Sequence, residues 1–554
     1  MSSPPTSRTA EPARSAQHRF IIVIPVADRP RHIRACLDSL HQLLQRYPYG
    51  DGDRISVLIA DDSAEAVHVA ANRDLAAEFS RRGLTTLHFG PDEQMALLAA
   101  LKTDLPGVCG AASRQGTCCA ANRENFGHKG QGVMRNIAYL KVAEILKNTP
   151  TDNLLIWSLD SDQEFCVKVT TPEGDREVYA VDYFHDLDTI FSRTDALVLT
   201  GKVVGDPPVS PAVMAGNFLA DVLGFLQRMA ASDPTAACGQ HGDAGQAGGD
   251  ASYHDMADLF GFQQAATAYH YRCPLAGAHT EADCCAHFAA RLNSFFYGEH
   301  PTRVSYYQHA DLLGSVQPAR TVYQGNYVFR PQALKYFAPF ATLRLRMSGP
   351  TLGRIIQAEI GARFVSANLP MLHKRTLESG GQSEFRPGIA TATEAVAPVI
   401  DISGEFERQF HGDVMLFSIE RLARERPIRE PADAAQQVPF GCSDLVANTI
   451  DAVRAELLEK YNSRQRAIVD RLQVLDKLLH NPACWWNRAP EHAATVANFA
   501  AFAANVAHNF GPDSAGHLRI NAAAGWARWR ADLLEAIVRY PSDRAAWEAQ
   551  LCAR

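Results

Sequence analysis

Residues 154–165 read LLIWSLDSDQEF, an apolar run that leads into two acids one residue apart, Asp160 and Asp162. A continuous apolar run of this length is typical of a strand buried on both faces of a sheet. Two carboxylates just past such a strand repel each other, and a shared divalent cation removes the repulsion. Mg²⁺ and Mn²⁺ prefer oxygen ligands and keep positions open for phosphate. The stretch therefore predicts a metal–diphosphate site, with a solvated turn or a helix N-cap as the alternative.

Strand and helix patterns alternate around this stretch, over residues 19–165. The run FIIVIPV (20–26) and the run before Asp61 and Asp62 are apolar and rich in β-branched residues, so both indicate further buried strands. The other elements expected here are a helix after Pro30, a helix at 65–82, a strand at 85–89 and a helix that follows the glycines at 130 and 132. This alternation is typical of a parallel sheet with helices on both faces, where ligands bind at the carboxyl ends of the strands.

Composition argues against several classes of protein. The chain of 554 residues is longer than one ordinary domain, and its net charge of −7 argues against a nucleic-acid surface, which needs a basic stripe. No apolar run reaches the roughly 18 residues of a membrane-spanning helix. Residues 1–18 are rich in Pro and Ser and contain no apolar signal-peptide region. We therefore expect a disordered leader and a cytoplasmic protein whose 12 cysteines are mostly free thiols.

Two further motifs favour the binding of a nucleotide. The acids at the end of the second strand, Asp61 and Asp62, can accept hydrogen bonds from a nucleoside base or ribose. In HKGQGVMRN (128–136) a Gly-rich turn precedes a helix start. Such a turn presents backbone N–H groups to an anion, and Arg135 adds positive charge against phosphate.

Six motifs follow one another in a fixed order along residues 19–376: FIIVIPV, VLIADD, GQGVMRN, LDSD, GNYVFR and LPMLHKR. Taken together they resemble the GT-A-fold glycosyltransferases of the family-2-like type. The resemblance implies an α/β fold, a GT-A (Rossmann-like) mixed sheet flanked by helices, with a mainly helical C-terminal extension. It also implies an enzyme that uses Mn²⁺ or Mg²⁺ to move a sugar from a UDP- or GDP-sugar to a hydroxyl of a saccharide or small-molecule acceptor.

The resemblance also assigns roles to individual residues. The metal ligands would be Asp160, Asp162 and His373, although a structural histidine after a strand is the alternative for His373. The nucleoside and the donor would be held by Pro25, Ala27, Asp61, Asp62, Lys129, Arg135 and Ser161. The catalytic residues would be Asp162, Arg135 and Asn326, with Gly325 beside Asn326 near the transferred sugar and the acceptor.

One departure from the family pattern concerns the general base. Inverting members of this type carry an acidic pair between the GN-x-x-x-R segment and the histidine. Here the corresponding segment is LRLRMSGPTLGRII (343–356), where Ser348, Gly349 and Pro350 stand in place of the acids and Glu359 is the nearest acid. Either the base comes from elsewhere, or the enzyme retains the anomeric configuration and needs no such base. We favour retention, and loss of catalysis is the third option.

The chain is expected to divide into five parts: a disordered leader (1–18), a nucleotide-sugar-binding half (19–231), a Cys- and His-rich insertion (232–290), an acceptor-side half (291–400) and a helical C-terminal extension (401–554). Formation of a homo-oligomer is left open. Two rival functions are a sugar-nucleotide nucleotidyltransferase and a catalytically silent nucleotide-sugar-binding protein. The nucleotidyltransferase is disfavoured because IPVADRPRHIRACL (24–37) lacks the usual Gly-rich loop.

The insertion contains nine cysteines and histidines but no C-x-x-C pair, and their spacings match no common closed zinc site. We therefore expect buried thiols and loop histidines rather than zinc. These residues are Cys238, His241, His254, His270, Cys273, His279, Cys284, Cys285 and His287. A disulfide that joins Cys118 or Cys119 to Cys109 or to the insertion is disfavoured in a reducing compartment.

Three other segments carry further predictions. Residues 404–422 mix charged and apolar positions and predict a helix with a charged face, or else a segment that closes the acceptor cleft. The Gly-rich residues 378–386 are expected to close over the donor. The adjacent Trp485 and Trp486 are expected to pack within the helical tail rather than to stack on a sugar.

Overall fold

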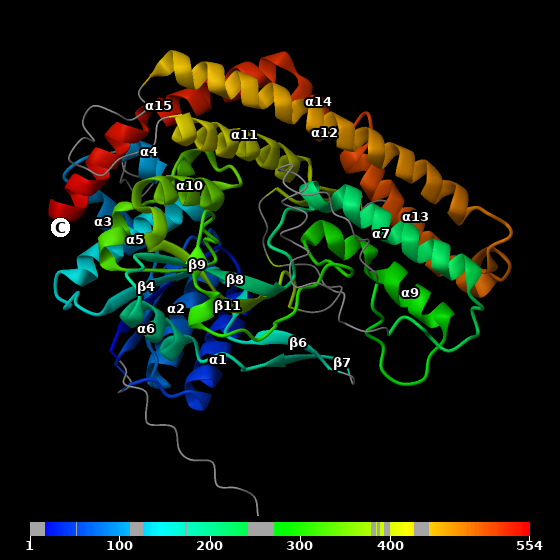
Figure 1. Ribbon diagram of the computed structural model, residues 1–554, viewed down its shortest axis with the longest axis horizontal. Coiled ribbons are helices and arrows are strands. Elements are labelled where there is room, and N and C mark those ends of the chain that lie inside the picture. Colours follow the sequence, from blue (N-terminus) through cyan, green and yellow to red (C-terminus); the bar gives the residue numbers. More distant parts are fainter. Residues whose placement is uncertain are drawn as a thin grey trace, which may run out of the picture.

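The computed structural model describes residues 17–50, 53–110, 126–171, 174–241, 271–377, 384, 388–392, 399–425 and 442–553. Within these ranges the chain has a mixed α/β fold in which one large sheet lies between helices (Figure 1). Long helices from the C-terminal part of the chain arch over one side of the sheet and extend well beyond it.

The large sheet contains nine of the described strands, in the order β3-β2-β1-β4-β10-β8-β11-β5, with β9 paired to β11. The strands are β1 (Arg19–Val26), β2 (Ile55–Asp61), β3 (Thr85–Phe89), β4 (Leu154–Leu159), β5 (Gln163–Glu164), β8 (Val198–Gly205), β9 (Gln317–Pro318), β10 (Asn326–Phe329) and β11 (Phe364–His373). Two separate hairpins pair β6 (Val167–Thr171) with β7 (Gly174–Val178) and β12 (Ala390–Ala392) with β13 (Val399–Asp401).

The described helices fall into those that precede residue 361 and a C-terminal set. The first set contains α1 (Pro30–Arg46), α2 (Ala66–Arg81), α3 (Pro91–Ala99), α4 (Pro106–Cys109), α5 (Gln131–Leu146), α6 (Tyr183–Arg193), α7 (Pro211–Ala231), α9 (Glu281–Arg291) and α10 (Ser348–Ile360). The second contains α11 (Ser403–Glu425), α12 (Ser443–Leu479), α13 (Ala493–Phe510), α14 (Ala515–Asn521) and α15 (Ala523–Ala553).

Most strands of the large sheet run in one direction. β1 is parallel to β2 and to β4, and β8 is parallel to β11. β10 is antiparallel to both β4 and β8, so these two strands point the same way. The carboxyl ends of β1, β2, β4, β8 and β11 therefore meet at one edge. The start of β10 lies at the same edge, since Asn326 is opposite Leu159.

Both faces of the sheet are buried, as the uninterrupted apolar runs of β1 and β4 require. Phe20 and Ile22 of β1 pack in one hydrophobic cluster with α1, α2 and α6. Ile21 and Val23 alternate with them and pack in a second cluster with α5. Each such side chain contributes about 1.5–3 kcal/mol when fully buried. The sheet is therefore a rigid base for the loops at its carboxyl edge.

The C-terminal helices belong to the same hydrophobic cluster as α5 and are packed on the sheet domain. α12 contacts α7, α11, α13 and α15, and α10 contacts α11. The fully buried Trp547 of α15 donates its indole N–H to the carbonyl of Leu334 over 2.9 Å. Trp485 donates in the same way to the carbonyl of Met229 in α7 over 2.8 Å, and Trp486 is buried beside it. These two tryptophans are packing residues, as expected.

The elements expected from the sequence agree closely with the structure. The helix expected at 65–82 is α2, and the strand expected at 85–89 is β3. The segment 404–422 lies in α11, where Glu405 and Asp413 are buried, whereas Arg408 and Arg421 are partly exposed. Polar side chains of α11 pack inward, which periodicity alone does not show.

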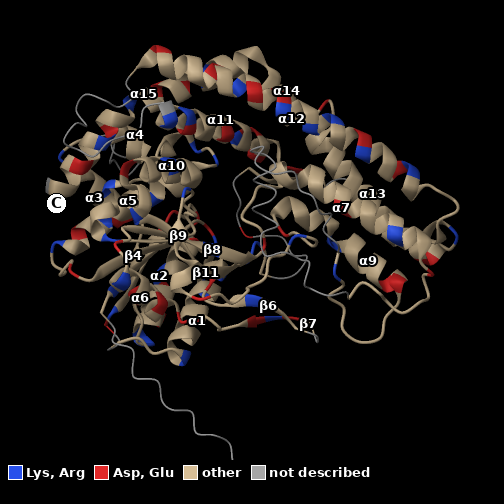
Figure 2. Cartoon of the chain, in the orientation of Figure 1, with Lys and Arg blue, Asp and Glu red and all other residues tan. Residues whose placement is uncertain are grey.

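No described helix is long and apolar enough to cross a membrane. Figure 2 shows acidic and basic residues interspersed along the surface helices, most clearly on α12. Mixed charge of this kind differs from the basic stripe of a nucleic-acid surface.

The buried Asp413 of α11 is expected to make the free energy of unfolding depend on pH. It accepts hydrogen bonds from Tyr461 of α12 (2.5 Å) and from Gln409 (2.8 Å), and burial raises its pKa to about 7. Because the folded pKa is raised, its contribution to the free energy of unfolding is complete below the unfolded value near 4 and is lost as pH rises through about 7. Asp413→Asn should abolish this part of the pH profile in urea unfolding between pH 4 and 8. The exposed Asp476 of α12, changed to Asn, is the control and should leave the profile unchanged.

Candidate functional site

A cavity of about 590 Å³ lies at the carboxyl edge of the sheet. Its walls come from the segments that follow β1, β2, β4, β8 and β11, the segment before β10, and residues of α10 and α11. Small-molecule sites of α/β sheets lie at this edge, and their volumes are typically about 300–1,000 Å³. The cavity is therefore the candidate site.

Asp160 lies in the cavity wall and is held from behind by Arg135. The Arg135 side chain is fully buried, donates to Ser158 Oγ and to Gln324 Oε1 (both 3.2 Å), and forms an ion pair with Asp160 Oδ1. Gln131 donates to the same carboxylate oxygen. Arg135 does not line the cavity, so its role here is to position Asp160 and to tie β4 to the segment before β10.

Asp162 is buried among two arginines and a histidine. Its Oδ2 lies 3.3 Å from a guanidinium nitrogen of Arg29 and 3.8 Å from one of Arg375, and its Oδ1 lies 3.6 Å from His373 Nε2. Burial raises the pKa of Asp162, but His373, Arg29 and Arg375 outweigh burial and hold it well below its usual value. Asp162 is therefore an ionised carboxylate at the centre of a cationic cluster.

The residues predicted to bind a metal fit a divalent cation in part. His373 Nδ1 lies 2.8 Å from the carbonyl of Asp206, so the Nδ1–H donates there and Nε2 turns its lone pair toward Asp162. The 3.6 Å between Nε2 and Asp162 Oδ1 is a separation that one ion bound to both atoms can bridge, since metal–ligand bonds are about 2.0–2.2 Å. Asp160 does not join them, because the described groups of three or more ligand atoms within 4.8 Å lie elsewhere.

Asp62 shapes the Gly-rich turn before α5. Its Oδ1 accepts the backbone N–H of Lys129 (3.1 Å) and pairs with the Lys129 ammonium (2.7 Å), and its Oδ2 accepts the N–H of Gly130 (3.1 Å). Gly130 has a φ of +97°, which only glycine adopts readily. Asp62 lines the cavity together with Pro25 and Ala27, but Lys129 lies behind the wall.

Two other predicted residues also lie behind the wall. Asp61 accepts hydrogen bonds from Asn72 (3.1 Å) and His88 (2.9 Å), and its side chain is fully buried. Asn326 accepts the indole N–H of Trp157 over 3.0 Å and donates to two backbone carbonyls. Their polar groups join strands and helices and do not reach the cavity.

Arginines that sequence reasoning missed form a second wall. Arg346 pairs with Glu405, and Arg408 lies 3.6 Å from the same carboxylate. The Arg344 guanidinium has no hydrogen bond or ion pair to the described residues, and Arg29 has two nitrogens without such a partner. The signal in the sequence is the segment LRLRM (343–347), in which two arginines alternate with apolar residues.

Left-handed backbone conformations cluster around the cavity. Of the six described non-glycine residues with positive φ, five lie in or beside its wall; these are Asp28, His128, Phe340, Arg344 and Met347. Each such conformation costs on the order of 1–3 kcal/mol and persists where the surrounding structure enforces it. Strain of this kind concentrates at functional sites.

The segment that lacks the acidic pair, residues 348–350, lies in the wall of the cavity. Ser348, Gly349 and Pro350 begin α10 and line the cavity, and Ser348 donates to Gln324 over 3.0 Å. The loop 378–386 lies outside the described residues except for Glu384. The Glu384 carboxylate accepts the backbone N–H groups of the residues at 31 and 32, at the start of α1.

The structure thus gathers most of the predicted site residues around one cavity. Those that line it are Pro25, Ala27, Asp62, Asp160, Ser161, Asp162, Gly325 and His373, whereas Asp61, Lys129, Arg135 and Asn326 lie behind it. Comparison with known proteins found no matching family model and no matching curated protein.

Gly325 should be essential for the position of Asp160. A Cβ at residue 325 would lie 2.7 Å from Asp160 Oδ2 and 2.4 Å from Gln163 Nε2, so Gly325→Ala should push both flexible side chains aside without unfolding the chain. For UDP and GDP, the ligands that the resemblance implies, we expect the affinity to fall about tenfold, or about 1.4 kcal/mol, by isothermal titration calorimetry. Gly224→Ala in α7, where the nearest atom is 3.7 Å away, should bind as the parent does. Equal affinity of the two variants would contradict this role of Asp160.

Proposed function

We propose that this protein is a GT-A-fold glycosyltransferase that moves a sugar from a UDP- or GDP-sugar to an acceptor hydroxyl. One observation carries the proposal. An ionised Asp162, surrounded by Arg29, Arg375 and His373, lies in a cavity at the carboxyl edge of the sheet. This combination of one carboxylate and several cations suits a diphosphate and its counter-ion.

The nucleoside is assigned to the part of the cavity beside β1. Pro25 lies near the end of β1, Ala27 follows this strand, and Asp62 follows the end of β2; all three line the cavity. The Asp62 carboxylate already accepts hydrogen bonds from the turn at 129–130, so it supports this pocket by fixing that turn. Nucleotides bind at this position in many open α/β sheets.

The diphosphate is assigned to the arginines. Arg29 and Arg344 offer N–H groups that no described residue accepts, and Arg375 has one further nitrogen of this kind. Such donors stabilise the negative charge that develops on a leaving nucleoside diphosphate. A Mn²⁺ or Mg²⁺ ion held by Asp162 and His373 would supply further charge neutralisation there. The arginines orient the phosphates.

The stereochemical outcome we propose is retention. Among the described residues, the cavity wall contains four acids, Asp62, Asp160, Asp162 and Glu405, and none lies in the segment 348–350. Glu405 is paired with Arg346 and accepts a hydrogen bond from Ser210 (3.2 Å), so its charge is already compensated. A retaining enzyme needs stabilisation of the leaving group and no dedicated base, which agrees with the excess of arginines.

The acceptor is assigned to the side of the cavity formed by α10 and α11. Glu405, Arg408 and Gln409 of α11 and Ser348 of α10 contribute polar groups to that side. A saccharide or a polar small molecule matches this lining, because hydroxyls both donate to carboxylates and accept from arginines. Three residues of the segment 404–422 are thus assigned to the acceptor side of the cleft.

Asp162→Ala tests the role of the carboxylate. UDP- and GDP-sugars with Mn²⁺ should raise the thermal unfolding midpoint of the parent, since a ligand at 100 times its Kd adds about 2.7 kcal/mol. The Mn²⁺-dependent part of this shift should disappear in Asp162→Ala. Asp152→Ala, an exposed acid at the other end of β4, is the matched control and should respond as the parent does. If Asp162→Ala keeps the full metal-dependent shift, the metal assignment is wrong.

Arg29→Met tests the role of the arginines. Loss of a charge-assisted hydrogen bond costs about 1.5–3 kcal/mol, so affinity for UDP or GDP should fall at least tenfold with and without Mn²⁺. Arg34→Met, an exposed arginine of α1 that pairs with Glu78, should bind as the parent does. An unchanged affinity of Arg29→Met would place the diphosphate elsewhere.

The products separate the rival functions. A glycosyltransferase or its slow donor hydrolysis releases UDP or GDP, whereas a nucleotidyltransferase releases pyrophosphate from a nucleoside triphosphate. Binding without release of either product would support a silent nucleotide-sugar-binding protein. Chromatography of the nucleotides after incubation with Mn²⁺ distinguishes the three.

A further inference from the structure

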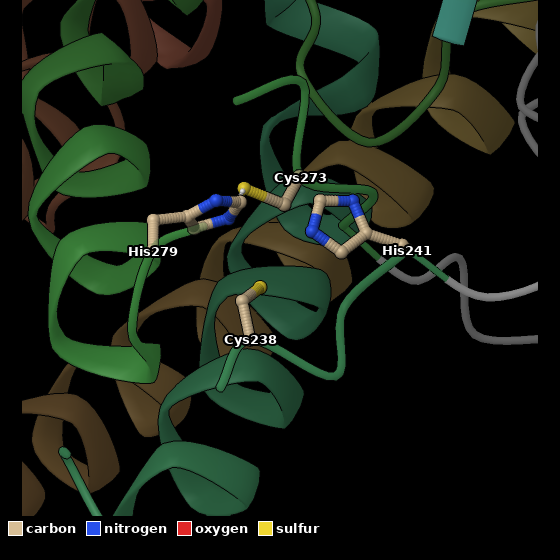
Figure 3. A group of neighbouring side chains, drawn as sticks. All are labelled: Cys238, His241, Cys273 and His279. Carbon is tan, nitrogen blue, oxygen red and sulfur yellow. Dashed lines mark hydrogen bonds between the residues drawn. The ribbon is translucent and has the colours of Figure 1, made fainter. Parts of the chain in front are cut away.

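Four metal-ligand side chains converge at a distance from the cavity. Cys238, His241, Cys273 and His279 bring one ligand atom each within 4.8 Å of one another (Figure 3). The Cys273 side chain points between the two imidazole rings, and Cys238 approaches from below. None of the four lines the cavity at the carboxyl edge.

Backbone hydrogen bonds hold the two halves of this cluster together. Cys238 and His241 follow α7, whereas Cys273 and His279 precede α9. The N–H of Cys238 donates to the carbonyl of His279, and the N–H of Cys273 donates to the carbonyl of Gln240, both over 3.0 Å. The positions of the side chains are therefore set by two segments that the chain itself has already joined.

The ligand atoms have the orientation that a metal requires. His279 Nδ1 lies 2.8 Å from the carbonyl of Gly277, so the Nδ1–H donates there and Nε2 turns toward Cys273 Sγ at 3.3 Å. A Zn–S bond of about 2.3 Å and a Zn–N bond of about 2.0 Å at the tetrahedral angle place sulfur and nitrogen about 3.5 Å apart. The observed separation is close to this value.

Neighbouring polar groups support the cluster. The N–H of Gln240 donates to Cys238 Sγ over 3.4 Å and so helps to fix the position of this sulfur. Glu281 accepts the N–H of Gly239 over 2.9 Å and so fixes the turn between Cys238 and His241. A third thiol, Cys284, lies behind Cys238 and is fully buried.

We propose that Cys238, His241, Cys273 and His279 form a structural Zn²⁺ site. Two thiolates and two imidazoles are the donors that zinc prefers over the oxygen-seeking Mg²⁺ and Mn²⁺. Four protein ligands fill a tetrahedral shell and leave no position for substrate, so the ion holds the fold and does not catalyse. On binding, the cysteine thiols lose their protons to solvent and each sulfur forms one bond to the ion.

The sequence carries this site as C-x2-H followed by C-x5-H, without any C-x-x-C pair. Because it contains no C-x-x-C pair, this pattern by itself favours ordinary thiols and loop histidines over zinc. Of the other residues in the insertion, Cys285 packs in the core, and His287 Nδ1 lies 2.7 Å from the Tyr271 hydroxyl. His254 and His270, like Cys118 and Cys119, lie outside the described residues. The inference is independent of the proposed function.

The test is the metal content of the full chain. Protein purified without chelator from zinc-supplemented medium should contain about one zinc ion per chain, as measured by inductively coupled plasma mass spectrometry. In Cys273→Ser and in His279→Ala, the zinc content should fall to that of the buffer alone. Cys285→Ala, a buried cysteine of α9 outside the cluster, and Cys442→Ala, an exposed cysteine, are matched controls that should retain it.

A second measurement uses the unchanged chain, in case the variants do not fold. After removal of zinc with a chelator, Co²⁺ should give the intense visible bands of a tetrahedral ion and a thiolate charge-transfer band. A parent chain without zinc, a Co²⁺ spectrum without thiolate ligation, or full zinc content in both ligand variants would overturn the proposal. A disulfide between Cys238 and Cys273 in the mapped peptides of the freshly purified chain would also overturn it.

Discussion

The buried guanidinium of Arg135 is the interaction on which the site depends. It enters from the first turns of α5 and joins Ser158 and Asp160 at the end of β4 to Gln324 just before β10. These segments belong to strands of opposite direction, and Arg135 donates to side chains of both, beside the Ser158 hydroxyl, which donates to the carbonyl of Gln324 over 3.3 Å. A buried charge is tolerated only when it is paired and hydrogen-bonded. The first-turn position of Arg135 therefore fixes the geometry of the cavity floor.

The distribution of charge is compatible with the proposal that carboxylates and a phosphate ligand share one cavity. Asp160 and Asp162 are each compensated by cations before any ligand arrives, so their mutual repulsion does not destabilise the empty fold. An anionic ligand then meets Arg29 and Arg344 rather than bare carboxylates. The arginines and a metal ion compete for Asp162, and the balance between them sets how strongly binding depends on the metal.

The sequence predicted the parallel strands well because an apolar run buried on both faces has few alternatives. It also placed the acids at the carboxyl edge, since the ends of parallel strands share that edge. It did not distinguish Asp61 from Asp62, because consecutive residues of a strand point to opposite faces. Asp61 points to Asn72 and His88, and Asp62 points to the turn before α5.

Contacts between distant segments were the least predictable. Arg344 and Arg346 reach the cavity through left-handed backbone at residues 340, 344 and 347. No local sequence pattern predicts this backbone conformation. The cluster at Cys238 and Cys273 likewise depends on a pairing of two segments separated by residues 242–272. A spacing rule for zinc sites assumes that each pair of ligands lies on one short turn of a familiar type, and here each half combines one cysteine with one histidine.

The packing of α11 has a consequence for how such a chain can change over time. This helix supplies Glu405, Arg408 and Gln409 to the cavity, and its apolar residues share a cluster with α5 beneath the sheet. The first 400 residues therefore do not form the complete cavity on their own. Exchange of the helical extension with that of another protein would remove one wall of the cavity together with part of the core. Recombination at this boundary is costly, so the sheet and the extension are expected to diversify as one unit.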